Sequence, residues 1–233
     1  MSHPRPATAL IVGAGSGLSA SIARTFSRAG IKIALAARTT DDLSALAHEV
    51  EGKSFACDAS KRSDVTNLFA QVSQVLGDPE VVVYNASYRT RGPFISLDPV
   101  DVEKSLAVSA YGGFLVAQEA ARRMLPRRQG VILLTGASAS VKGYAQSAPF
   151  AMGKFALRGL AQSMARELGP HGIHVAHFVI DGGIRSARRV EQGDKPDSFL
   201  DPDAIAATYL QVLQQPRSAW SFEVELRPWV ETF

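Results

Sequence analysis

The chain has 233 residues, of which 46% are hydrophobic, so it can bury a sizeable core and is not expected to be disordered. Its formal net charge of +3 is spread along the sequence rather than gathered into a basic stripe, which argues against a nucleic-acid partner. A single cysteine excludes an internal disulfide and a cysteine metal cluster.

The N-terminal segment, MSHPRPATALIVG, passes from a short polar arm directly into a brief apolar run. It lacks the core of a signal peptide and the roughly 18 apolar residues of a membrane span. Together with the single cysteine, this predicts a cytoplasmic protein without a membrane partner.

Short β-type runs alternate with helix-patterned segments along the whole chain, 1–233, without a linker or repeat. The predicted strands are 7–13, 31–37, 53–58, 80–86, 130–136, 174–180 and 221–227. The predicted helices are 17–30, 40–51, 62–76, 99–125, 147–169 and 202–215. Such alternation favours a single α/β domain in which a doubly wound, seven-stranded parallel sheet carries helices on both faces.

A glycine-rich turn, Gly13-Ala14-Gly15-Ser16-Gly17-Leu18, follows the first strand and opens a helix. Such a turn lets backbone N–H groups and the positive end of the helix approach a pyrophosphate. Leu18 stands where the common dinucleotide fingerprint has its third glycine, so a tight turn without a ligand remains an alternative.

The end of the second predicted strand indicates which dinucleotide would bind. An acidic residue there would hydrogen-bond the ribose of NAD, whereas this chain has the neutral Ala37 followed by Arg38. Arg38 can pair with a 2′-phosphate, which favours NADP(H) over NAD(H). A solvated surface arginine is the alternative.

A polar segment, 181–201, follows the sixth predicted strand and is long enough to form a lid over a site. Its arginines, Arg185, Arg188 and Arg189, either attract an acidic substrate or are simply solvated. His174 and His177 belong to the preceding strand, where their spacing places them on opposite faces, so no metal site is predicted.

Taken together, these stretches resemble the short-chain dehydrogenase/reductase family over nearly the whole chain. Gly13-x-x-x-Gly17-x-Ser19 is similar to its glycine motif, Asp58 to the acid used on the adenine ring, and Asn85-Ala86-Ser87 to its Asn-Ala-Gly strand end. The resemblance implies a Rossmann-like fold. With Arg38, the expected cofactor-binding residues are Gly13, Ser16, Gly17, Leu18, Arg38, Asp58, Asn85, Ala86, Ser87, Lys154, Gly182 and Ile184.

The same resemblance places Lys154 at the lysine of the family's Tyr-x-x-x-Lys motif, which holds the nicotinamide ribose and lowers the pKa of the tyrosine. Here Phe150 occupies the tyrosine position and Ala137 the position of the substrate-binding serine, while Ser109 replaces a structural asparagine. A shifted alignment would make Ser138 the family serine. The expected catalytic positions are therefore Lys154, Phe150, Ala137 and Ser138. We expect Lys154 to direct its ammonium to the ribose.

The function expected is an NADP(H)-linked oxidoreductase with altered proton delivery, acting on a small carbonyl or alcohol substrate. Ser138, Ser140, Tyr144 or a water held by Lys154 could replace the missing acid. The alternative is a catalytically inactive dinucleotide-binding sensor or interaction protein.

The resemblance implies a homodimer or homotetramer built on the predicted helices 99–125 and 147–169. Three aromatic residues, Phe94, Tyr111 and Phe114, are expected to be core or helix-packing residues, with substrate contact as the alternative.

Overall fold

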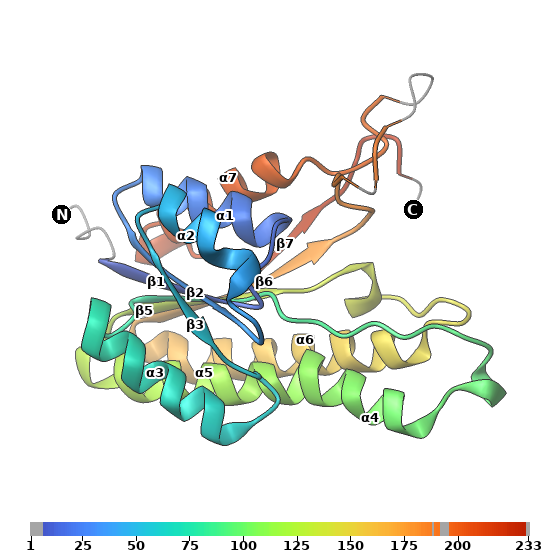
Figure 1. The fold of residues 1–233 in the computed structure, drawn as a ribbon, viewed down its shortest axis with the longest axis horizontal. Coiled ribbons are helices and arrows are strands. Elements are labelled where there is room, and N and C mark those ends of the chain that lie inside the picture. The colour runs from blue at the N-terminus through green and yellow to red at the C-terminus, as the bar shows by residue number, and fades with distance from the viewer. Residues whose placement is uncertain (1–6, 188, 192–195, 232–233) are drawn as a thin grey trace.

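A computed structural model describes residues 7–187, 189–191 and 196–231. Its centre is a seven-stranded parallel sheet with the order β3-β2-β1-β4-β5-β6-β7, which confirms the predicted fold (Figure 1). The strands are β1 (Thr8–Val12), β2 (Lys32–Ala37), β3 (Lys53–Ala56), β4 (Val81–Tyr84), β5 (Gly130–Thr135), β6 (Ile173–Ile180) and β7 (Glu223–Leu226).

The winding of the chain reverses beside β1. Val12, the last residue of β1, pairs with Ala36 of β2 on one side and with Tyr84 of β4 on the other. From β1 to β3 the chain therefore moves across the sheet in one direction, and from β4 to β7 it moves in the other. In an open parallel sheet such a reversal creates a crevice at the carboxyl ends of the strands, where ligands bind.

Helices cover both faces of the sheet (Figure 1). On one face lie α1 (Leu18–Arg28), α2 (Ser44–Glu49) and α7 (Pro202–Leu213). On the other lie α3 (Arg62–Leu76), α4 (Pro99–Leu106), α5 (Gly112–Met124) and α6 (Ala148–Leu168). Among the described residues, no helix combines the length and apolar character that crossing a membrane requires.

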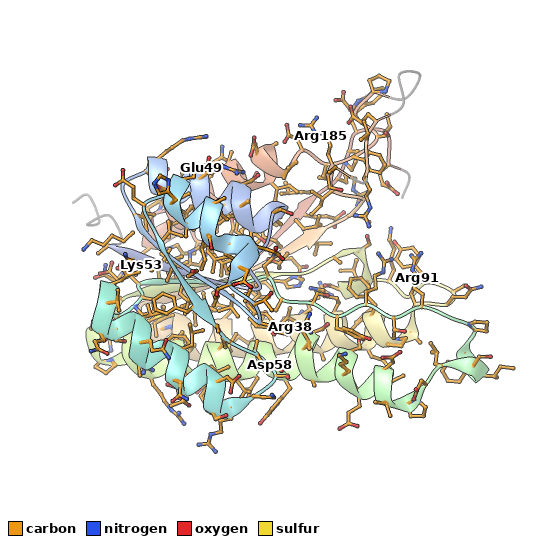
Figure 2. All side chains as sticks on the ribbon, in the orientation of Figure 1. Arg38, Glu49, Lys53, Asp58, Arg91 and Arg185 are labelled. Atoms are coloured by element: carbon orange, nitrogen blue, oxygen red, sulfur yellow. The ribbon has the colours of Figure 1, made fainter. Side chains whose placement is uncertain are left out.

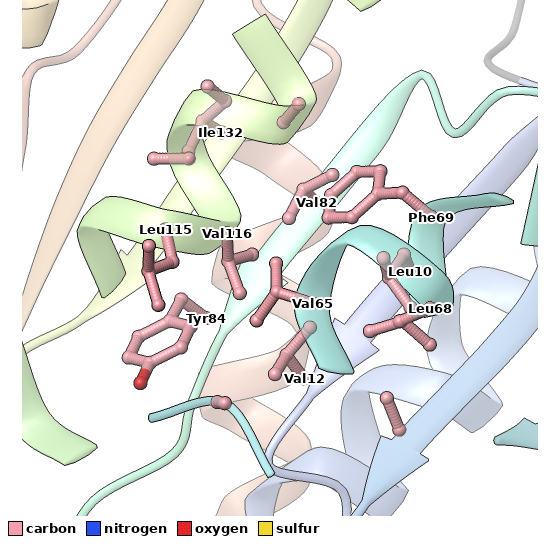
Figure 3. Close-up of a cluster of buried hydrophobic side chains, with 14 of the residues drawn as sticks. Leu10, Val12, Val65, Leu68, Phe69, Val82, Tyr84, Leu115, Val116 and Ile132 are labelled. Atoms are coloured by element: carbon pink, nitrogen blue, oxygen red, sulfur yellow. The ribbon is translucent and has the colours of Figure 1, made fainter. Parts of the chain in front are cut away.

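Two apolar cores explain the continuous hydrophobic runs of the strands. Leu10 and Val12 of β1 contribute to the core beneath α3 and α5 (Figure 3), whereas Ala9 and Ile11 contribute to the core beneath α1 and α7. Successive side chains of a strand point to opposite faces, so a strand covered on both sides must be apolar throughout. Burial of each such side chain stabilises the fold by about 1.5–3 kcal/mol.

The prediction of one regular helix over 99–125 was wrong in detail. Asp98 caps α4 by accepting a 2.9 Å hydrogen bond from the N–H of Val100, and a π-helical turn, Ala107–Tyr111, then separates α4 from α5. The hydroxyl of Tyr84 donates a hydrogen bond to the carbonyl of Val108 within this turn. A π turn adds one residue without interrupting the helix, so the hydrophobic period gives little sign of it.

Of the readings for Phe94, Tyr111 and Phe114, a place in the core was wrong. Phe94 is 80% exposed, Tyr111 50% and Phe114 41%, and the last two rings stack on each other with centroids 6.2 Å apart. Phe114 lies on α5, whose opposite side meets the sheet. Within the described residues, no further helix or strand covers that outer side, so an apolar side chain there stays exposed.

Candidate functional site

A cavity of about 330 Å³ lies at the reversal beside β1. Its wall is formed by the residues that follow four strands: Gly13 after β1, Arg38 after β2, Asp58 after β3 and Asn85 after β4. Figure 2 shows Arg38 and Asp58 on neighbouring loops at this edge of the sheet. The structure therefore brings together, in one cavity, the predicted residues Gly13, Arg38, Asp58, Asn85, Ala86 and Ser87.

Sequence reasoning missed part of the cavity wall. Ala37, named above for its lack of charge, also lines the cavity, and the further lining residues are Val12, Ala14, Thr39, Cys57, Ala59, Tyr88 and Val108. Most of these carry small or apolar side chains. Only their position, within two residues of a predicted strand end or within the predicted helix 99–125, could have indicated them.

Gly13 allows β1 and β4 to approach at the floor of the cavity. It has φ +84°, and a Cβ at this position would collide with the backbone of Ala86. Ser19 donates a 2.9 Å hydrogen bond to the carbonyl of Gly13 and accepts one of 2.7 Å from the side-chain amide of Asn85. Ser19 thus fixes the glycine turn to the end of β4.

The amino end of α1 lies beside this turn. No side chain caps the helix at Gly17, its first turn has no acidic residue, and a Cβ on Gly15 or Gly17 would meet open space. The free N–H groups and the helix dipole therefore favour an anion here. Ser16, Gly17 and Leu18 lie outside the cavity wall, and the Leu18 side chain is buried in the core, so only its backbone is available to a ligand.

Asp58 is held as a carboxylate. Its Oδ1 accepts hydrogen bonds of 2.7 Å from the Ser60 hydroxyl and 3.1 Å from the Ser60 N–H, while the Lys61 ammonium lies 3.9 Å from Oδ2. The Ser60 hydroxyl makes the largest contribution to the lowered pKa of Asp58. Arg38, by contrast, is exposed and forms no ion pair within the described residues.

The Lys154 ammonium has a hydrogen-bond partner within the protein. Lys154 is 3% exposed, and its Nζ donates a 2.7 Å hydrogen bond to the carbonyl of Thr135, the last residue of β5. Burial lowers the pKa of Lys154 to about 8. The protein therefore supplies one partner for the ammonium, because Lys154 on α6 reaches the end of β5. The expected contact with the nicotinamide ribose stays a prediction.

Phe150 precedes Lys154 by one turn of α6, and Ala137 lies two residues beyond Thr135. Phe150 is half-buried in the first turn of α6, with its ring centroid 5.8 Å from Lys154 Nζ and 4.9 Å from the guanidinium carbon of Arg89. Ala137 continues from β5 in an extended conformation, and its N–H donates to the Ser140 hydroxyl at 3.1 Å. Ser138 begins a short 3₁₀ turn, Ser138–Ser140, and is half-buried.

Ser109 is buried in the π turn and links this turn to the loop after β4. Its hydroxyl accepts a 3.3 Å hydrogen bond from the N–H of Tyr88 on the loop after β4. A Cβ on Gly153 would come within 2.8 Å of the Ser109 Cβ, so α6 packs closely against this turn. Ser109 therefore positions the β4 loop relative to α6.

A polar network joins α6, β6 and β7. His177 is fully buried, and its Nδ1 lies 3.0 Å from Oε2 of Glu223, whose carboxylate also receives two 2.7 Å hydrogen bonds from Arg158. Burial is the main cause of the lowered pKa of His177. His174 instead bonds the carbonyl of Ser221 and stacks on Trp220. No group of metal ligands occurs among the described residues.

The segment 181–201 is anchored at both ends where it is described; Arg188 and residues 192–195 lie outside the described residues. Asp181 is buried, with Lys142 Nζ at 3.5 Å and Arg227 at 3.3 Å from its carboxylate. Arg185 pairs with Asp201 at 2.8 Å.

Two predicted cofactor residues of this segment lie away from the cavity wall. Gly182 has φ +145° and packs against Pro228, while Ile184 forms a β-bridge with Leu200 and contacts the core beneath α7.

The sequence pattern of the family described as short chain dehydrogenase matches residues 7–196. A relative from Melia azedarach, (21S)-21-acetoxyl-apo-melianone synthase SDR, is 33% identical over 87% of this chain and 81% of its own. Short chain aldehyde dehydrogenase 1 from Euphorbia lathyris is 30% identical over 86% of this chain and 70% of its own.

Solved structures agree with these matches. A short-chain dehydrogenase from Rhodopseudomonas palustris has a TM-score of 0.83 and 36% identity, covering 97% of this chain and 100% of its own. A metagenomic short-chain oxidoreductase in complex with NADP has a TM-score of 0.82 and 27% identity, covering 95% of this chain and 97% of its own.

Proposed function

Because this chain belongs to the short-chain dehydrogenase family of oxidoreductases, we propose that it binds NADP(H) in the cavity beside β1 and acts on a small carbonyl or alcohol substrate with altered proton delivery. The observation that carries the proposal is the convergence of Gly13, Arg38 and Asp58 on one cavity at the reversal of the sheet. When bound, the nicotinamide would supply or accept the hydride.

The residues present fit a dinucleotide with a 2′-phosphate. The uncapped amino end of α1 suits the pyrophosphate, and the open space at Gly15 and Gly17 admits it. Arg38 has no carboxylate partner within the described residues, and Ala37 offers none to a ribose hydroxyl. The metagenomic relative crystallised with NADP supports the same preference. Gly182 and Ile184 remain proposed contacts that a closer approach of the 181–201 segment would provide.

Proton delivery is the part in which we propose a departure from the family. Phe150 has no exchangeable proton and Ala137 has no hydrogen-bond donor in its side chain, so neither can hold or protonate a substrate oxygen. Lys154 Nζ is engaged with Thr135, and burial lowers its pKa to about 8. The remaining hydroxyl groups near the end of β5, those of Ser138 and Tyr144, are our candidates for the proton route.

The test measures binding before turnover. Calorimetric titration with NADPH and NADH should show tighter binding of NADPH, and NADPH oxidation should then be followed over a panel of aldehydes and ketones. Slow turnover that falls in Ser138→Ala or Tyr144→Phe supports the altered proton route. NADPH binding without turnover on any substrate favours a sensor or interaction role instead, and absence of NADPH binding contradicts both.

We also propose a homodimer or homotetramer in the cytoplasm, built on the outer faces of α4–α5 and α6. The exposed rings of Tyr111, Phe114 and Phe155 on these helices support such an interface. Sedimentation velocity should give a dimer or tetramer, and Phe114→Asp should shift it toward the monomer. A wild-type monomer would contradict this assembly.

A further inference from the structure

Arg89 lies beside Phe150, and two other arginines, Arg91 and Arg189, are close enough to Arg89 to act on its charge. Arg89 and Arg91 lie on the loop after β4, and Arg189 lies in the 181–201 segment. The Arg89 guanidinium carbon is 4.9 Å from the centroid of the Phe150 ring. Within the described part of the chain, none of the three forms an ion pair.

Backbone hydrogen bonds fix both segments. The N–H of Gly92 donates to the carbonyl of Gln146 at 3.2 Å, which ties the β4 loop to the segment before α6. Ser186 and Arg189 exchange backbone hydrogen bonds of 3.1 and 3.0 Å in a tight turn. Figure 2 shows Arg91 on the side of the molecule toward which the arrowheads of β6 and β7 point, beyond the carboxyl ends of the strands.

The grouping is electrostatically unfavourable in the free protein. Burial lowers the pKa of Arg89, and the positive charges of Arg91 and Arg189 lower it further. Arg185, in the same segment as Arg189, shows the contrasting arrangement, since Asp201 neutralises it at 2.8 Å. Like charges gathered without a counter-ion on a defined surface are typical of an anion-binding site.

The ring of Phe150 explains how Arg89 is positioned. A guanidinium stacks well on an aromatic face, which holds its planar fork in place while leaving its N–H groups available. A carboxylate or phosphate can then accept two parallel hydrogen bonds. Phe150 would thus serve as a platform for the arginine at the position where the family has its acid.

We propose that Arg89, assisted by Arg91 and Arg189, binds a carboxylate or phosphate group of the substrate and so selects small anionic carbonyl or alcohol compounds. This inference rests on the proposed function, because it assumes that the substrate lies beside Phe150. It assigns Arg89 as a specificity-determining residue of that site.

The experiment compares matched anionic and neutral carbonyl compounds on the NADPH-loaded protein. Levulinate is paired with methyl levulinate, and dihydroxyacetone phosphate with dihydroxyacetone, so that the carboxylate and phosphate classes are separated. Calorimetry should show at least about 10-fold tighter binding of one anion than of its neutral analogue, since a charge-assisted hydrogen bond contributes about 1.5–3 kcal/mol. Binding should weaken with added salt.

The variant is Arg89→Met, which keeps a flexible, unbranched side chain at this position and removes the charge. It should lose at least about 10-fold in affinity for the anion and leave the neutral analogue unchanged. Arg28→Met, an exposed arginine in the last turn of α1, is the matched control and should bind as the wild type does.

Two failures are distinguishable because NADPH affinity is measured first. If NADPH does not bind, the proposed function fails and this inference fails with it. If NADPH binds equally to the wild type and Arg89→Met, but neither anion binds better than its neutral analogue or the variant loses nothing, only the anionic-substrate inference is overturned.

Discussion

The Lys154 ammonium donates a 2.7 Å hydrogen bond to the carbonyl of Thr135, so a buried cation joins the end of β5 to α6. Burial lowers the pKa of Lys154 from 10.5 to about 8, which means that the charged form is disfavoured in the folded protein. Between these two pH values the unfolded chain binds more protons than the folded one. The contribution of Lys154 to the free energy of unfolding must therefore rise with pH in this window.

The first prediction concerns how the free energy of unfolding changes with pH. Between pH 8 and pH 10.5 the free energy of unfolding of the wild type should rise by about 3 kcal/mol relative to that of Lys154→Met, because methionine has no proton to lose. At pH 7 the variant should be as stable as the wild type or more stable. Urea unfolding at several pH values measures both curves.

Lys32→Met, at an exposed position at the start of β2, is the control and should keep the wild-type pH dependence. Parallel curves for the wild type and Lys154→Met would show that the lysine retains its ordinary pKa. A large loss of stability at pH 7 would instead make the Thr135 bond essential to the fold.

A second prediction concerns the same variant and the cofactor. Lys154→Met should bind NADPH more weakly, because the lysine holds the end of β5 beside the proposed nicotinamide position and is our candidate for the ribose contact. Calorimetry of wild type, Lys154→Met and Lys32→Met compares the affinities. Unchanged affinity in Lys154→Met would remove this lysine from the cofactor site.

The third prediction tests cofactor preference. Arg38→Ala should weaken NADPH binding by about 10–150-fold, which corresponds to the 1.5–3 kcal/mol of a charge-assisted contact, and should leave NADH binding almost unchanged. NADH serves as the internal control, since it lacks the 2′-phosphate. Equal affinities for the two cofactors in the wild type would refute the assignment of Arg38.

The fourth prediction concerns acid stability. The pKa of His177 is lowered by burial, so the unfolded chain takes up a proton near pH 6.5 that the folded chain does not, and stability should fall by up to about 1.4 kcal/mol per pH unit below that point. His177→Asn should flatten the curve between pH 6.5 and 5. His48→Asn, on the exposed side of α2, is the control. Equal slopes in all three proteins would mean that His177 titrates freely.

The alternation of strands and helices could be predicted because the central strands β1, β4 and β5 are apolar on both faces and most helices begin after a recognisable turn. Gly13, Arg38, Asp58 and Asn85 could be grouped for the same reason, since each follows a strand and parallel strands end at one edge.

Other features gave no sequence signal. The partner of Lys154 is a backbone carbonyl, which any residue at position 135 would supply. The π turn adds a single residue to a helix and hardly changes its hydrophobic period. Phe94 is apolar but exposed, and an apolar residue type alone predicts burial rather than exposure. The arrangement of Arg89 on Phe150 requires the β4 loop to reach α6, and no local pattern encodes that contact.

The last prediction concerns catalysis. Phe150→Tyr combined with Ala137→Ser should raise carbonyl reduction by NADPH at least about 10-fold, because a general acid alone typically contributes about 10²–10⁴ in rate. Phe150 lies one helical turn before Lys154, and Ala137 lies two residues beyond Thr135, so both new hydroxyls would sit around the buried ammonium. The half-buried ring edge tolerates an added hydroxyl with little repacking.

Phe155→Tyr, the same change on an exposed face of α6, is the control and should have no effect. Robust wild-type turnover that is insensitive to Ser138→Ala and Tyr144→Phe would show that the proton arrives by another route. A double variant that binds NADPH yet gains no activity would count against an altered enzyme site and favour a purely binding role.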